Sequence, residues 1–282
     1  MYLYPGTALA LKPQDKFLLA GITDAARSAG RLALEFFRPG GATSAGISHK
    51  AGGSPVTEAD YAVDRFLRGR LMAMLPEAGW LSEESEDSHS RLAKERVFIV
   101  DPIDGTRGFS RGHPAWSIAI ALVERGRPQI GVIHAPALAQ TFAAAKGTGA
   151  TLNGRPIEVS KRPALGPDAK VAAPAFLAER LRAAGLDFEL QPRLPSLALR
   201  IVNVASGALD AGLAGGDAYD WDIAAADLVL EEAGGKLTGF DGRALLYNGP
   251  HTRHGPLAAA PAQLHAEITA AARRGSPGKY DP

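Results

Sequence analysis

The sequence predicts an α/β (α+β) fold in which helices and β-sheets form layers. The first half combines two amphipathic helix patterns with a series of apolar strands separated by turn sequences. In the second half, strand and helix patterns alternate along the chain, which is the order expected of a layered α/β unit. The 282 residues are 46% apolar and 22% charged, so the composition is globular and the length allows one large domain or two small ones.

Two helices are expected before the first long strand. Apolar residues recur at helical spacing over residues 15–37, and a Pro-Gly-Gly sequence ends the pattern. The Gly/Ser-rich segment 40–54 follows and is typical of a loop. A second helix is predicted to begin after Thr57, which caps it together with Asp60 three residues on, and to continue to Pro76.

A buried strand is expected at residues 97–100, because this run is continuously apolar and rich in β-branched residues. Pro102 has no N–H to donate to a neighbouring strand, so pairing is expected to stop there. Strands at 116–123, 129–134 and 141–145 are separated by short turns, which predicts an antiparallel meander.

A functional turn is predicted directly after the buried strand. The carboxylates of Asp101 and Asp104 and the carbonyl of Ile103 are hard oxygen ligands of the kind that Mg²⁺ prefers. Gly105 lets the backbone approach a ligand, Thr106 adds a hydroxyl, and the N–H groups of both residues can hold a phosphate oxygen. An ordinary Asp-Pro turn capped by Asp104 is the alternative interpretation.

The best candidate for a subdomain boundary is the proline- and glycine-containing segment 162–168. It divides the chain into an α+β part, residues 1–165, and an α/β part, residues 166–282. In the second part, strands are expected at 171–173, 188–191, 209–214, 236–240 and 256–260, and helices at 176–184, 197–206, 221–233 and 262–273. Residues 275–282 are expected to fray.

Three more carboxylates stand at predicted element ends. Glu83 is the first acid after a short apolar strand, Asp222 opens a helix directly after Trp221, and Asp60 lies in the first turn of its helix. Taken singly, Asp60 and Asp222 are explained as helix caps. Glu86 and Asp87 are explained as part of a solvated loop, whereas Glu83 stands at the strand end, where a metal ligand could lie.

Composition and missing motifs exclude several classes of protein. There is no cysteine, so disulfides, thiolate metal sites and a cysteine nucleophile are excluded. The seven histidines show no zinc-binding spacing, and the chain has neither a Gly-x-x-x-x-Gly-Lys-Ser/Thr loop nor a Gly-x-Ser-x-Gly elbow. Lysine and arginine total 31 against 30 acids, which predicts no nucleic-acid partner. No signal peptide or membrane span is evident, so a cytoplasmic protein is expected.

Four sequence motifs, in this order, resemble those of the inositol monophosphatase family of Mg²⁺-dependent, lithium-sensitive phosphatases. Residues 101–106 resemble the first family signature, and residues 221–226 with 232–235 resemble the second. Residues 55–60 and 83–85 also stand where the family has equivalents. The resemblance covers essentially the whole chain and implies a layered αβαβα sandwich.

The resemblance also implies a set of metal ligands. Glu83, Asp101 and the Ile103 carbonyl would hold one Mg²⁺, and Asp101, Asp104 and Asp222 would hold a second. A third, looser ion would lie near Glu83. Mn²⁺ would be a substitute, and Li⁺ or Ca²⁺ would inhibit.

The remaining site residues also follow from the resemblance. Thr106 and Asp60 would orient the attacking water, with Asp60 accepting its proton directly or through the Thr106 hydroxyl, while Glu83 would support catalysis through its metal ion. Substrate contacts are predicted for Lys50, Asp104, Gly105, Thr106, Arg200 and Asp222.

The substrate is predicted from a few positions. Inositol-binding members have a glutamate seven residues before the Trp-Asp aspartate, where this chain has Gly215. Lys50, Arg200 and Asp220 instead resemble the bisphosphate nucleotidase pattern, and added cations suit an extra phosphate. We therefore expect a 3′(2′),5′-bisphosphate nucleotidase that removes the 3′-phosphate of adenosine 3′,5′-bisphosphate.

Three alternatives stay open at this point. Inositol-1-phosphatase and histidinol-phosphatase activities occur on the same scaffold, which the fold alone does not distinguish. Some relatives act instead as protein partners in RNA processing or transcription. The family includes monomers and dimers, and of the two we favour a homodimer.

Overall fold

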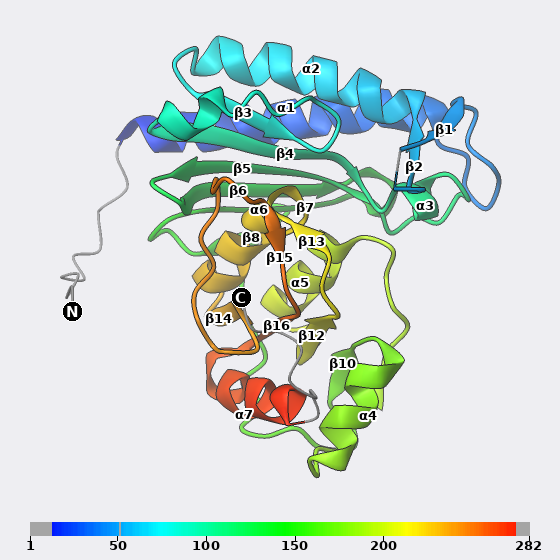
Figure 1. Ribbon diagram of the computed structural model, residues 1–282, viewed down its shortest axis with the longest axis vertical. Coiled ribbons are helices and arrows are strands. Elements are labelled where there is room, and N and C mark those ends of the chain that lie inside the picture. Colours follow the sequence, from blue (N-terminus) through cyan, green and yellow to red (C-terminus); the bar gives the residue numbers. More distant parts are fainter. Residues whose placement is uncertain (1–12, 51, 275–282) are drawn as a thin grey trace.

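The computed structural model describes residues 13–50 and 52–274, which form five alternating layers of helix and sheet (Figure 1). Two long helices pack on the outer face of a seven-stranded sheet, two more lie between the two sheets, and a last pair covers the far face of a five-stranded sheet. The αβαβα sandwich is thereby confirmed. The three pairs are α1 (Pro13–Phe36) with α2 (Glu58–Met74), α5 (Leu197–Ala205) with α6 (Asp220–Glu232), and α4 (Ala175–Ala183) with α7 (Ala262–Arg273).

The seven-stranded sheet runs in chain order, β3-β4-β5-β6-β7-β8-β9. Only the pair β3 and β4 is parallel, and the rest is the predicted antiparallel meander. The strands are β3 (Gly79–Ser82), β4 (Arg96–Asp104), β5 (Ser117–Glu124), β6 (Arg127–Ala135), β7 (Gln140–Ala145), β8 (Ala150–Leu152) and β9 (Arg155–Ile157).

The five-stranded sheet has the order β11-β10-β12-β16-β14. Its first three strands are parallel, so their carboxyl ends lie at one edge of the sheet. The strands are β10 (Lys170–Ala172), β11 (Glu189–Leu190), β12 (Ala211–Ala214), β14 (Gly235–Gly239) and β16 (Leu257–Pro261). All nine elements predicted for the second half are present, together with an unpredicted two-stranded pair, β13 (Ala218–Tyr219) with β15 (Arg253–His254).

Strand β4 contributes to two hydrophobic cores, because successive side chains point to opposite faces of a sheet. Phe98 and Val100 pack in the core with α1 and α2, whereas Val97 and Ile99 pack in the core with α5 and α6. This explains why residues 97–100 of the strand are all apolar. By the same alternation, Asp101 follows on the side of α5 and α6.

Two local predictions were wrong. Pairing of β4 does not stop at Pro102 but continues to Asp104 after a shift of register, so the strand passes through the proline at an irregular position. The segment 40–54 is also more than a loop, because β1 (Ile47–His49) pairs with β2 (Pro55–Thr57) in a small antiparallel hairpin.

The remaining expectations concern the chain ends and the subdomains. Residues 1–12, residue 51 and residues 275–282 lie outside the described part of the chain, and the predicted fraying of residues 275–282 falls there. The boundary at residue 165 stays a prediction. Within the described ranges, no helix is long and apolar enough to cross a membrane.

Candidate active site and metal centre

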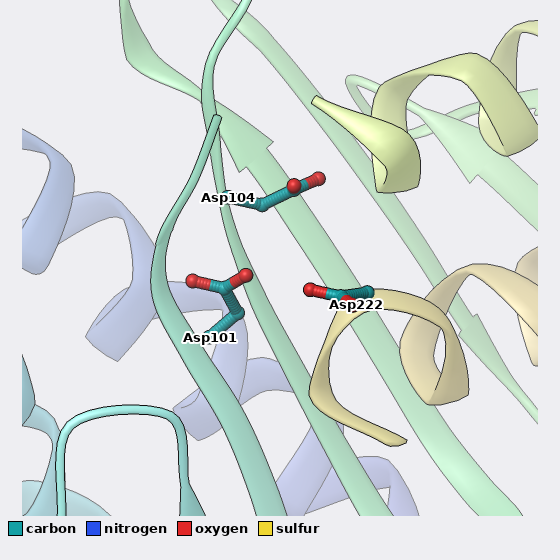
Figure 2. Close-up of side chains that lie close together, drawn as sticks. All are labelled: Asp101, Asp104 and Asp222. Atoms are coloured by element: carbon teal, nitrogen blue, oxygen red, sulfur yellow. The ribbon is translucent and has the colours of Figure 1, made fainter. Parts of the chain in front are cut away.

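Three carboxylates from distant parts of the chain converge at one point, as Figure 2 shows. Asp101 and Asp104 lie at the end of β4, and Asp222 lies in the first turn of α6. One oxygen of each carboxylate lies within 4.8 Å of one oxygen of the others. Because the end of β4 is irregular, Asp101 and Asp104 can both face this point.

Asp104 is held by the N-terminus of α5. Its carboxylate accepts the backbone N–H groups of Ala198 at 2.7 Å and Leu197 at 3.2 Å, and the hydroxyl of Ser196. These N–H groups have no partner inside the helix, so the acid satisfies them and also places its charge at the positive end of the helix dipole. The end of β4 is thereby fixed to the helix layer between the sheets.

The other two acids are oriented by nearby backbone groups. Asp101 accepts the N–H of Ile103 at 3.0 Å, and Asp222 accepts the N–H of Tyr219 at 2.6 Å. Asp222 is the third residue of α6 and accepts the N–H of the residue before the helix, so it takes part in the cap but is not the N-cap residue that the sequence analysis expected. This contact leaves part of the carboxylate pointing toward Asp101 and Asp104 (Figure 2).

Gly105 is required by the close approach of two segments. Its φ is +93°, and a Cβ at this position would lie 3.0 Å from the backbone nitrogen of Ser196. Any larger residue would push α5 away from Asp104. The short helix α3 (Thr106–Phe109) begins immediately afterwards and brings the Thr106 hydroxyl toward Asp60.

The converging charges determine the electrostatics of the site. Burial, reinforced by neighbouring carboxylates, raises the pKa of Asp101 and of Asp222 well above their usual range. Burial also raises the pKa of Asp104 to about 6. A cluster of buried carboxylates is stable at neutral pH only when bound protons or cations neutralise its charge. Carboxylate oxygens at this spacing suit a hard divalent cation.

Asp60 and Thr106 form the expected pair beside the carboxylates. The Thr106 hydroxyl lies 3.1 Å from one Asp60 oxygen and 2.9 Å from the carbonyl oxygen of Ile103. The second Asp60 oxygen accepts the backbone N–H of Thr57 at 2.8 Å and its hydroxyl at 2.6 Å. Asp60 is fully buried, and this burial raises its pKa to about 6.

Glu83 lines the same cavity but is not part of the three-carboxylate group. The Lys50 ammonium lies 2.7 Å from Glu83 and 2.7 Å from Glu84. Burial opposes the charge on Lys50, but the two glutamates outweigh it and raise its pKa. Lys50 is thus beside the predicted metal ligands, paired with acids. No sequence pattern indicated that Glu84 takes part in this pairing.

Comparisons with known proteins agree with this geometry. The model of the inositol monophosphatase family matches residues 15–276. The chain belongs to the inositol monophosphatase family. A histidinol-phosphatase from Mycobacterium tuberculosis is 38% identical over 238 residues, covering 81% of this chain and 88% of that protein.

Two further relatives extend the comparison. The 3′(2′),5′-bisphosphate nucleotidase CysQ of Aggregatibacter actinomycetemcomitans is 31% identical over 242 residues, covering 82% of this chain and 87% of that protein. The crystal structure of extragenic suppressor protein suhB from Bartonella henselae superposes with a TM-score of 0.78 at 27% identity, covering 92% of this chain and 100% of that one. As a member of the inositol monophosphatase family, the present chain is a metal-dependent phosphatase.

Arg200 lies elsewhere than the sequence analysis expected. Its side chain is 3% exposed and donates to the carbonyl oxygens of Leu213 at 3.2 Å and Leu194 at 3.1 Å. Burial lowers its pKa to about 10. Arg200 is not among the residues that line the catalytic cavity, and it joins the end of β12 to the loop that carries Arg193. We therefore revise its expected role from substrate contact to positioning.

Two arginines that the sequence analysis missed do line the catalytic cavity, whose volume is about 290 Å³. Both Arg107 and Arg193 are exposed, and neither forms an ion pair with any residue in the described ranges. Arg107 follows directly after the first family signature, a position that could have drawn attention to it. Arg193 lies in a loop with no recognisable motif, so nothing in the sequence marked it.

Proposed function

We propose that this phosphatase removes the 3′-phosphate from adenosine 3′,5′-bisphosphate and so acts as a 3′(2′),5′-bisphosphate nucleotidase. The observation that carries the proposal is that Arg107 and Arg193, on the wall of the catalytic cavity, form no ion pair with any described residue. A substrate with only one phosphate, engaged at the carboxylate cluster, would leave these guanidinium groups without an anion. A second phosphate supplies one, and guanidinium groups bind phosphate oxygens through paired hydrogen bonds.

The surroundings of Gly215 support the same choice. Phe176 occupies the space in front of this glycine, because a Cβ on Gly215 would lie 3.0 Å from the Phe176 ring. Phe176 is 48% exposed and follows β10, whose carboxyl end shares an edge of the sheet with that of β12. Where polyol-binding relatives carry a glutamate, this chain therefore has a glycine packed against the Phe176 ring, with the Arg180 guanidinium 5.5 Å from the ring centroid, and the acid that would bind inositol is missing.

The converging carboxylates of Asp101, Asp104 and Asp222 fit divalent cations, and two to three Mg²⁺ ions are proposed, with Asp101 contributing to two of the sites. Glu83, Asp101 and the Ile103 carbonyl are proposed for one ion, and Asp104 and Asp222 with Asp101 for another. When bound, such ions activate water and neutralise the oxygen of the leaving group.

The chain's own contribution is to move a proton and to hold the phosphate. Asp60, with a pKa of about 6, is ionised at neutral pH and can accept a proton through the Thr106 hydroxyl 3.1 Å away. Gly105 and Thr106 line the catalytic cavity, and their backbone N–H groups are proposed to hold a phosphate oxygen.

Histidinol phosphate is the second candidate substrate, favoured by the 38% identity to the histidinol-phosphatase of Mycobacterium tuberculosis. Phosphate release should therefore be measured with malachite green for adenosine 3′,5′-bisphosphate, histidinol phosphate and inositol-1-phosphate, each with Mg²⁺. We expect the adenosine compound to have the highest kcat/KM. A higher value for histidinol phosphate would transfer the assignment to that substrate. Failure to hydrolyse any of the three would favour the role of a protein partner.

A further inference from the structure

A second cavity, with a volume of about 470 Å³, adjoins the catalytic one. The two share Arg107 and Pro195 on their walls, so Arg107 stands between them. We call it the Arg111 cavity. It is lined by Gly40, Arg107, Gly108, Arg111, Gly112, His113, Pro114 and Pro195.

The Arg111 cavity is cationic, in contrast to its neighbour. Arg107, Arg111 and His113 line it, and no acid from residues 13–50 or 52–274 does. Arg111 is exposed and forms no ion pair with another residue of the described chain. The Nδ1 atom of His113 accepts the backbone N–H of Ala115 at 3.1 Å, so the ring proton of the neutral form resides on Nε2, which is left as a donor. Donors without acceptors on one wall point to an anionic ligand.

The wall of this cavity is held rigidly by the backbone. Gly112 has a φ of +73°, and a Cβ there would lie 2.3 Å from the carbonyl oxygen of Arg38. The N–H of Gly40 donates to the carbonyl of Gly112 at 2.9 Å, and the N–H of His113 donates to that of Gly108 at 2.9 Å. The backbone of this loop is fixed on both sides. Little conformational entropy of the backbone is therefore lost when an anion binds to its cationic side chains.

We propose that the Arg111 cavity binds the phosphate of a bisphosphate substrate that is not hydrolysed. This inference rests on the proposed function and names where its second phosphate lies. The reacting phosphate occupies the carboxylate cluster. The other phosphate lies beside Arg107, where the two cavities adjoin, and is held by Arg111 and His113 on one side and by Arg107 and Arg193 on the other. A substrate with one phosphate uses the first cavity alone.

The test compares pairs of substrates that differ by one phosphate. One pair is adenosine 3′,5′-bisphosphate with adenosine 3′-monophosphate, and the other is fructose 1,6-bisphosphate with fructose 1-phosphate. The measured quantity is the ratio of kcat/KM for the bisphosphate to that for the monophosphate, in the native chain, in Arg111→Gln and in Arg68→Gln. Arg68 is an exposed arginine of α2 that lines neither cavity, which makes it a matched control for lost charge.

We expect the native chain to prefer the bisphosphate in at least one pair. Arg111→Gln should lower that ratio about tenfold through KM, as expected for a charge-assisted contact, and Arg68→Gln should leave it unchanged. Arg111→Lys should recover part of the loss. An equal loss on both members of a pair, or no loss, would overturn the subsite. Activation of monophosphate hydrolysis by free inorganic phosphate through Arg111 would also overturn it, by marking a site for a separate anion.

The two proposals fail in different ways. If adenosine 3′,5′-bisphosphate is not hydrolysed but fructose 1,6-bisphosphate is preferred in an Arg111-dependent manner, the nucleotidase assignment is wrong and the subsite stands. If neither bisphosphate is preferred over its monophosphate, the subsite is wrong, whichever of the compounds the enzyme hydrolyses.

Discussion

Without divalent cations, the stability of this protein should fall as the pH rises. Burial raises the pKa of Asp104 from 3.8 to about 6. Because the folded state binds this proton more tightly than the unfolded state, the stability that it contributes is present below about pH 4 and is lost as the pH rises through about 6. A shift of about 2 units, at about 1.4 kcal/mol per unit, corresponds to about 3 kcal/mol for this group alone. The raised pKa values of Asp101 and Asp222 act in the same direction.

The assay is thermal unfolding, followed by circular dichroism, of metal-free protein near pH 5 and near pH 8, with and without Mg²⁺. The metal-free Tm should be lower near pH 8. Mg²⁺ at about 100 times its Kd should add about 2.7 kcal/mol near pH 8, or about 5–10 °C in Tm for a chain of this size. The gain should be smaller near pH 5, where protons compete for the same oxygens.

Two variants locate the effect. Asp222→Asn removes one of the converging charges, so it should weaken both the pH dependence of the metal-free protein and the gain with Mg²⁺. Glu267→Gln, an exposed acid of α7, should change neither. An identical Tm in chelator and in millimolar Mg²⁺ near pH 8 would refute the view that cations neutralise this cluster.

Three other predictions concern individual side chains. Asp60→Asn should lower kcat by about 100-fold or more, and in the native enzyme kcat should rise with pH through about 6 as Asp60 loses its proton, which a pH–rate profile checks. Ser196→Ala should lower the free energy of unfolding by about 1 kcal/mol, because its hydroxyl accepts the Leu199 N–H at the start of α5, and urea denaturation measures this loss. Arg193→Gln should raise KM for adenosine 3′,5′-bisphosphate about tenfold with little change in kcat, and an unchanged KM would remove Arg193 from the substrate side.

The sequence was most informative where burial is uniform or a cap is local. Strand β4 could be predicted because both of its faces are covered, which makes every position from Val97 to Val100 apolar. The start of α6 could be predicted to within one residue because Asp222 lies in its first turn and accepts the N–H of Tyr219, the residue before the helix. Such signals lie within a few residues of the structure they specify.

The sequence was least informative where the partner lies far away along the chain. Hairpin β1–β2 was missed because the side chains of β1 are exposed and show no apolar alternation. Arg200 was misjudged because the carbonyl that engages it, that of Leu213, lies 13 residues further on. The amino-acid sequence alone does not distinguish an arginine that contacts substrate from one that contacts main-chain carbonyls.

The contacts of Asp104 determine how mutations in this site should be interpreted. Its carboxylate accepts the first backbone N–H groups of α5 and also faces the other acids. Replacing Asp104 therefore disturbs the helix and the candidate ion site together. Asp101 accepts one backbone N–H, that of Ile103 in its own turn, and does not cap a helix. Loss of turnover in Asp101→Asn therefore reports on chemistry, whereas the same loss in Asp104→Asn would mix chemistry with misfolding.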